Sequence, residues 1–184
     1  VIREALVFER SNFPRTIHII DNLDAACKPV MCDAGQMHQV IINICNNALH
    51  AMGMDTGELV VKLGQIKSGP PEHILHSLQN PSAEYIELMI RDTGCGMDSE
   101  ILSKVFDPFF STKEVGQGTG LGLSVVHSII KNIDGEIKIE SAPGEGTTIK
   151  IWLPTTEQLP QAKEAPKAVP AVKENFPILF VDDE

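Results

Sequence analysis

The sequence predicts a domain that mixes α-helices with β-strands, and three segments support that prediction. Residues 34–54 place apolar side chains at the spacing of one helix face, so this face belongs to a core. Residues 116–122 are a glycine-rich loop that leads into an apolar helix predicted over 121–133. Residues 136–141 and 147–154 alternate between apolar and polar residues around a Gly-rich turn, which is typical of a hairpin with one buried face.

The other elements follow from the same patterns. Residues 1–13 suit the last turns of an amphipathic helix that has little of its own to pack against and ends at Pro14. A short helix is expected at 99–105, and Gly135 is expected to cap the helix that precedes it. Strands are expected at 16–20, 58–63 and 85–91, with a turn and a short strand that ends at Asp33.

Composition and charge restrict the class of function. The chain has 184 residues and a formal net charge of −10, which argues against broad binding to nucleic acid or to anionic lipid. No apolar run approaches the ~20 residues of a membrane span, and whether a parent protein is anchored in a membrane stays open. The four cysteines lack the spacing of zinc ligands, so we expect buried reduced thiols and a cytoplasmic location.

Six of the fourteen glycines fall within residues 91–124, in two clusters separated by an aromatic block. Glycine is favoured where the backbone takes a positive φ or where a group approaches the main chain closely. Because the second cluster leads into a helix, its free N–H groups and the helix dipole predict a phosphate-binding loop. The loop has neither the ending of a P-loop nor the spacing of a dinucleotide fingerprint. A flexible surface loop is the alternative.

The helix over 34–54 has an uncharged polar face. No Lys, Arg, Asp or Glu occurs between Asp33 and Asp55, although solvated helix faces normally carry them, and Asn is a poor helix former. Asn43, Asn47 and His50 lie on one stripe of this helix. Carboxamide oxygens can complete the oxygen shell of Mg²⁺ when phosphates supply the negative charge. The alternative is that the amides bond backbone groups of a neighbouring loop.

Two further segments point to a nucleotide. The strand over 85–91 delivers Asp92, followed by Thr-Gly-Cys-Gly, and a carboxylate at that point can accept the exocyclic amine of adenine. An Asx turn is the alternative for Asp92. The segment 106–113, Phe-Asp-Pro-Phe-Phe-Ser-Thr-Lys, runs into the glycine loop and suits a mobile lid. Lys113 at its end is near enough to reach a phosphate, or else it is a solvated lysine.

Together these motifs resemble the ATP-binding catalytic domain of bacterial sensor histidine kinases, which belong with gyrase, chaperone and mismatch-repair ATPases to the Bergerat-fold superfamily. The resemblance covers residues 14–154 and rests on four boxes in the order of the family. They are an asparagine box at 43–48, a first glycine box at 92–96, a phenylalanine box at 106–113 and a second glycine box at 116–123.

The resemblance implies an α+β fold, a two-layer sandwich in which a mixed sheet of about five strands has three main helices on one face and a mobile ATP lid. It implies that Asn47 ligates Mg²⁺, that Asn43 supports the phosphates and that Asp92 reads adenine. It makes Asn43 and Lys113 the catalytic residues. Many relatives have Lys or Arg where this chain has His50, so a phosphate contact from His50 would depend on pH. The other implied ATP contacts are Gly94, Gly96, Gly116, Gly118, Thr119, Gly120, Leu121, Gly122 and Thr147.

The implied function is transfer of the ATP γ-phosphate to a protein histidine. Hydrolysing members of the superfamily place a Glu one turn before the magnesium asparagine, and this chain has Asn43 there. Because an amide cannot act as a general base, we expect slow hydrolysis. The alternatives are a nucleotide-sensing or docking module without transfer, and a gyrase-like ATPase that closes as a dimer, which the missing Glu disfavours.

The resemblance also implies partners. The family carries its phosphoacceptor in a motif like His-Glu-x-x-x-Pro-Leu, and no histidine of this chain has those neighbours. The implied partners are therefore a histidine-bearing dimerisation domain of the same protein and a receiver domain. The parent protein is expected to be a homodimer, whereas this chain can be monomeric and is not expected to label itself.

Four segments are expected along the chain. Residues 1–13 are the end of the dimerisation helix, and residues 14–154 are the ATP-binding domain. Residues 155–175, rich in Pro, Ala and charge, are a flexible linker. Residues 176–184 form an apolar strand that ends in two aspartates, which resembles the first strand of a receiver domain; an acidic tail is the alternative.

Overall fold

A computed structural model describes residues 1–53, 56–66, 84–112 and 119–157. Five strands form a single sheet in the spatial order β1, β2, β3, β5, β4. Strand β1 pairs with β2 in parallel, and the other three pairs are antiparallel. The strands are β1 (Ile17–Leu23), β2 (Gly57–Gln65), β3 (Tyr85–Asp92), β4 (Glu136–Ala142) and β5 (Gly146–Pro154).

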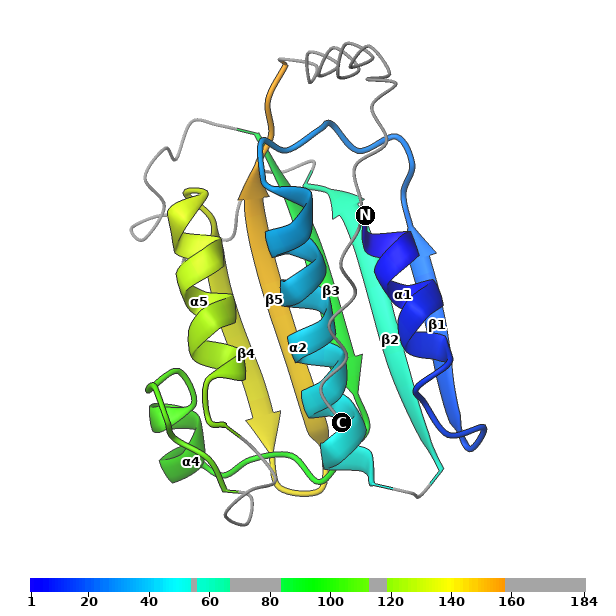
Figure 1. The fold of residues 1–184 in the computed structure, drawn as a ribbon, viewed down its shortest axis with the longest axis vertical. Coiled ribbons are helices and arrows are strands. Elements are labelled where there is room, and N and C mark those ends of the chain that lie inside the picture. The colour runs from blue at the N-terminus through cyan, green and yellow to red at the C-terminus, as the bar shows by residue number, and fades with distance from the viewer. Residues whose placement is uncertain (54–55, 67–83, 113–118, 158–184) are drawn as a thin grey trace, which may run out of the picture.

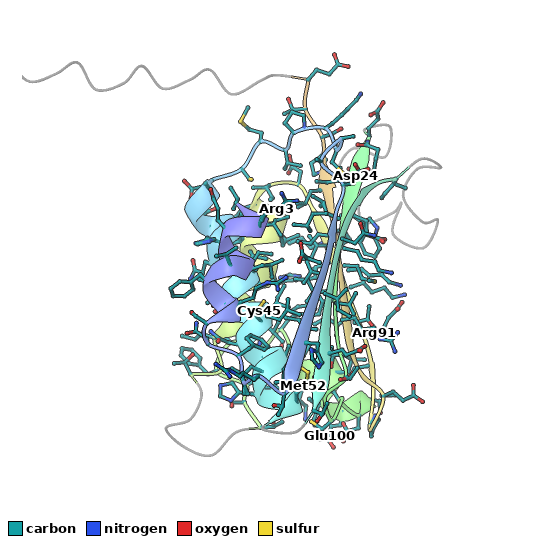
Figure 2. The ribbon with its side chains drawn as sticks, turned by 90° about the vertical axis from the view of Figure 1, so that its right-hand side faces the viewer. Arg3, Asp24, Cys45, Met52, Arg91 and Glu100 are labelled. Carbon is teal, nitrogen blue, oxygen red and sulfur yellow. The ribbon has the colours of Figure 1, made fainter. Side chains whose placement is uncertain are left out.

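Helices α1 (Ile2–Arg10), α2 (Ala34–Met52) and α5 (Gly122–Asn132) lie together on one face of the sheet (Figure 1). Figure 2 shows the sheet from its edge, with these helices on one side and strand side chains such as Arg91 on the other. The short helix α4 (Ser99–Lys104) lies at one end of the sheet, beside β4. The expected two-layer α+β fold, with a mixed five-stranded sheet and three helices on one face, is thus confirmed.

Helix α2 forms as its sequence predicts. Asp33 is the N-cap, and its Oδ1 accepts a hydrogen bond from the Gln36 amide at 2.8 Å. The helix ends at Gly53, whose φ of 64° stops the helical course. Its apolar face is buried against the sheet and the other helices, through Met37, Val40, Ile41, Ile44, Cys45, Ala48 and Met52.

Helix α1 packs more closely than expected. The prediction that this helix has little to pack against is wrong, because Ala5 is 0% and Leu6 2% exposed in the common core. The helix also ends earlier than expected, at Arg10, and Ser11 rather than Pro14 closes it. Long-range contacts with α2 decide this packing, and the local pattern does not contain them.

The segment before α2 departs from prediction as well. Strand β1 runs on to Leu23, and no strand lies between residues 24 and 33. Asp24 turns the chain, since its side chain accepts a hydrogen bond from the Ala26 amide at 2.9 Å. Pro29 then lacks the N–H that a sheet ladder requires.

The end of α5 is closed by two residues. Asp134, not Gly135, takes the left-handed conformation, with φ of 56°. The Asp134 amide donates to the Lys131 carbonyl at 3.1 Å and the Gly135 amide donates to the Ile130 carbonyl at 2.9 Å, which is a Schellman motif. Gly135 is needed for close approach, because a Cβ there would come within 2.9 Å of the Trp152 carbonyl oxygen.

The residues directly after β5 are tied to the domain. The Thr155 amide donates to the Glu84 carbonyl, and the Thr156 amide donates to the Pro29 carbonyl, each at 2.8 Å. Residues 158–175 of the expected linker and the expected receiver strand lie outside the described residues. Within the described ranges, no helix has the length and apolar content to span a membrane.

Candidate nucleotide site

The site begins where the apolar rows of the sheet stop. Strands β3, β5 and β4 align their helix-facing residues in rows across the sheet. Two rows are wholly apolar, Leu88 with Ile151 and Ile137, and Ile90 with Ile149 and Ile139. The next row consists of Asp92, Thr147 and Ser141. Three polar side chains therefore stand where the strand pattern calls for core residues.

Asp92 lies at the β3 end of this row, beside Thr147, and is 7% exposed. Its Oδ1 accepts hydrogen bonds from the Gly94 amide at 2.8 Å and from the Thr147 amide at 3.2 Å. The Asx-turn interpretation is thus correct for Oδ1, whereas no donor reaches Oδ2 from the described residues. Burial raises the pKa of Asp92, and the two amides only partly oppose it. One oxygen of this largely buried side chain, Oδ2, remains available to a ligand.

The first glycine cluster lets the loop after Asp92 pack closely between α2 and β4. A Cβ on Gly94 would come within 2.6 Å of the Ala51 Cβ on α2, and a Cβ on Gly96, whose φ is 67°, would overlap the Ala142 carbonyl oxygen. The Cys95 amide donates to the Ala51 carbonyl at 3.0 Å, which ties the loop to α2. Glycine is therefore needed at these positions because the loop packs closely against the rest of the protein. This reason differs from the one predicted from the sequence, which is the close approach of a ligand to the main chain.

The asparagines of α2 face the start of α5. A Cβ placed on Gly122 would lie 3.7 Å from the Asn47 Nδ2 and 3.9 Å from the Asn43 Oδ1. Within the described part of the chain, neither amide side chain has a hydrogen-bond partner, and residues 113–118 of the neighbouring glycine loop lie outside that part. Helix α5 has no side-chain cap at Leu121. Its free N–H groups and the two amides together suit an anion with a cation bound to it.

The segment before the second glycine cluster is held by aromatic and backbone contacts. The rings of Phe106 and His127 lie 4.8 Å apart, which fixes Phe106 against α5. Phe109 has φ of 68° and is 77% exposed, and its amide donates to the Gly120 carbonyl at 3.0 Å. Gly120 itself has φ of 65°, and a Cβ there would meet the Phe109 backbone at 2.5 Å, so both the angle and the close approach favour glycine.

Some of the remaining predicted ATP contacts lie within the described residues, and the others lie outside them. His50 lies about one turn of α2 beyond Asn47 and is exposed. Thr119 is exposed, and its hydroxyl accepts a hydrogen bond from the Leu121 amide at 3.3 Å. Lys113, Gly116, Gly118 and the centre of the expected lid lie outside the described residues.

Sequence reasoning missed one residue of the polar row, Ser141. Its Oγ lies within hydrogen-bond distance of three groups, from Met97, Gly146 and Thr147. The signal that could have found it is its position, because Ser141 falls on the inward side of a strand whose other inward residues are isoleucines.

The cysteines also need a correction. All four are unpaired, but only Cys45 is buried, and Cys95 is exposed in the loop beside Asp92. Burial raises the pKa of the Cys45 thiol to about 12, so it is protonated at neutral pH. The expectation of buried thiols holds for Cys45 and is wrong for Cys95.

Fold and site together define a class: a mixed-sheet nucleotide-binding domain in which paired helix amides face the uncapped start of a second helix. Residues 32–157 match the sequence model of the family described as histidine kinase-, DNA gyrase B-, and HSP90-like ATPase. The chain belongs to this family. Its fold is that of a histidine kinase catalytic domain, and this assignment is favoured over a gyrase-like ATPase.

Named relatives agree with this assignment. Sensor kinase CckA of Brucella abortus is 40% identical over 164 residues, which are 85% of this chain and 17% of that protein. Sporulation kinase E of Bacillus subtilis is 37% identical over 147 residues, which are 80% of this chain and 17% of that protein. The catalytic domain of histidine kinase ThkA has a TM-score of 0.66 at 26% identity, covering 84% of this chain and 90% of that one.

Proposed function

We propose that this chain binds ATP with Mg²⁺ and acts as the catalytic domain that passes the γ-phosphate to a histidine on another domain. The observation that carries the proposal is the meeting of Asn43 and Asn47 with the uncapped start of α5. Amide oxygens can ligate Mg²⁺, and main-chain N–H groups can donate hydrogen bonds to the phosphate oxygens of a magnesium triphosphate.

The residues fit the proposed ligand at both ends. Asn47 offers a neutral oxygen to Mg²⁺, and Asn43 lies one turn earlier on the same face to support the phosphates. Asp92 Oδ2 lies at the far end of the site, where it can accept the exocyclic amine of adenine. When bound, Mg²⁺ would neutralise charge on the phosphates. Within the described residues no group of three or more His, Cys, Asp or Glu side chains could hold a metal.

The site favours transfer over hydrolysis. Asn43 occupies the place one turn before Asn47, and an amide cannot take a proton from water. Catalysis then depends on positioning the phosphate acceptor. The proposed acceptor is a histidine of a separate dimerisation domain, because no histidine of this chain has the neighbours of the phosphoacceptor motif that the family carries.

The proposed domain boundaries follow the sequence. Residues 1–13 are the end of the dimerisation helix, 14–154 the ATP-binding domain, 155–175 a linker and 176–184 the first strand of a receiver domain. A relative from Pseudomonas aeruginosa, 36% identical over 123 residues, is named two-component sensor PprA, which supports a pathway of this kind. The parent protein is then a cytoplasmic or membrane-anchored homodimer.

The direct test supplies the missing acceptor. The chain is incubated with γ-labelled ATP, alone and with the dimerisation domain of CckA, its 40% identical relative. We expect acid-labile label on the added domain only, and turnover of free ATP far below that of a dedicated ATPase. Asn47→Ala should abolish labelling, whereas Asn46→Ala, which alters an exposed neighbour on α2, should not. Acid-labile phosphohistidine on this chain alone would contradict the proposal.

A further inference from the structure

The Ser141 hydroxyl joins three elements beside Asp92. Its Oγ accepts a hydrogen bond from the Met97 amide at 2.9 Å, which holds the loop after β3. The same Oγ lies 2.9 Å from the Gly146 carbonyl oxygen and 3.0 Å from the Thr147 Oγ1. A hydroxyl has one proton and two lone pairs, so three partners use all of its capacity.

The chemistry of the partners fixes the direction of each bond. The Gly146 carbonyl can only accept, so the single Ser141 proton goes to it. The Met97 amide can only donate, and it takes one lone pair of Ser141. The second lone pair must then accept the proton of Thr147. Thr147 consequently has no proton left for a ligand and presents only lone pairs.

Thr147 and Asp92 are direct cross-strand partners, so their free acceptors are neighbours. We propose that Ser141 is a positioning residue that sets the base specificity of this site, an inference that rests on the proposed nucleotide binding. By holding the Thr147 proton, Ser141 leaves the base end with acceptors only, Thr147 Oγ1 and Asp92 Oδ2. Such a site complements the exocyclic amino group of adenine and repels the 6-oxo group of hypoxanthine or guanine.

Removal of the Ser141 hydroxyl frees the Thr147 proton, which can then turn toward a ligand and donate to a 6-oxo group. The readout is the ratio of the dissociation constants of inosine diphosphate and ADP. A general loosening of the loop weakens the binding of both nucleotides and cancels in this ratio, whereas a change of the Thr147 hydroxyl from acceptor to donor does not cancel.

The test measures both dissociation constants by calorimetry on the full chain and five variants. Wild type should prefer ADP, and Ser141→Ala should lower the ratio about tenfold, the scale of one mismatched buried hydrogen bond. Thr147→Val should lower it by a similar factor, and the double variant should lower it no further, because the two hydroxyls act as one unit. Ser141→Thr keeps the hydroxyl and should keep the ratio.

Thr148→Val is the matched control, because the Thr148 side chain points to the opposite face of β5 from Thr147. The ratio of the two dissociation constants should be the same in this variant as in wild type. If Ser141→Ala weakens both nucleotides equally, Ser141 is merely structural and the inference is wrong, while nucleotide binding stands. If Ser141→Ala fails to fold, as judged by its melting transition, a wild-type ratio in Thr147→Val overturns the inference alone. Wild type that binds neither nucleotide at millimolar concentration overturns both proposals.

Discussion

At the scale of single residues, Glu9 is an acidic side chain inside an apolar core. It lies on the buried face of α1 and is 1% exposed, and neither carboxyl oxygen has a hydrogen-bond partner among the described residues. Burial raises the pKa of Glu9 above its ordinary value of 4.5, and Asn12 and His38 only partly oppose this shift. The charged form of Glu9 therefore opposes the docking of α1.

This gives a prediction for stability against pH. Below pH 4.5 Glu9 is protonated in both states, so its contribution is fully present there. As the pH rises through the raised pKa of the folded state, that contribution is lost, by about 1–3 kcal/mol. In Glu9→Gln this loss should be absent, which denaturant unfolding across the pH range would measure.

Glu4→Gln is the control, because Glu4 lies on the same helix with its side chain 82% exposed. Its unfolding free energy should stay within about 0.5 kcal/mol of wild type at each pH. If Glu9→Gln and Glu4→Gln show the same pH dependence as wild type, Glu9 is not held in the environment described here.

At the scale of elements, the loop after β3 depends on its glycines for packing. A Cβ on Gly94 would meet the Ala51 side chain at 2.6 Å and the Ala51 carbonyl carbon at 2.7 Å, and backbone cannot yield as a side chain can. Gly94→Ala should therefore destabilise the domain by about 1–3 kcal/mol and also weaken nucleotide binding by displacing Asp92. Thermal melting and an ADP titration would measure the two effects.

Gly64→Ala provides the contrast within the same sheet. Gly64 on β2 has no heavy atom within 4 Å of the added Cβ, and its φ is not positive. This substitution should be neutral or stabilising by up to about 1 kcal/mol, since it reduces the freedom of the unfolded chain. Equal destabilisation by both substitutions would show that close approach is not what Gly94 provides.

The elements also show how far local pattern reaches. Helix α2 and the hairpin of β4 and β5 were predictable, because their periodicity is strong and both bury one face along their whole length. The packing of α1 was not, since Leu6 and Glu9 meet core residues that the local sequence does not contain. The strand predicted within residues 24–33 does not form. The apolar residues there suggested a strand, but the segment begins with a turn in which the Asp24 side chain bonds the backbone.

The site divides in the same way. Asn43, Asn47 and Asp92 stand out in the sequence because uncharged amides on a helix and an acid at a strand end are unusual, and their roles toward a nucleotide stay predictions. Ser141 was not, since a serine in a strand is ordinary until the register places it beside Thr147. Its role depends on a cross-strand neighbour and on a loop residue, Met97, which is 44 positions away.

At the scale of the whole molecule, the nucleotide site lies at one end of the helix-covered face. The core fills the space between the sheet and helices α1, α2 and α5, and the site begins where the last apolar row of β3, β5 and β4 ends. One continuous packing therefore holds the amides of α2, the start of α5 and Asp92 in fixed relation. The account depends on these three groups acting as one site.

A calorimetric titration of the chain with a non-hydrolysable ATP analogue and Mg²⁺ tests this most directly, with Asp92→Asn and the exposed control Asp21→Asn, on the edge strand β1, beside wild type. We predict saturable one-to-one binding by wild type and by Asp21→Asn. Binding by Asp92→Asn should be at least about tenfold weaker, because an amide presents a donor where the base needs an acceptor. No heat from wild type at millimolar ligand, or wild-type affinity in Asp92→Asn, would contradict the account.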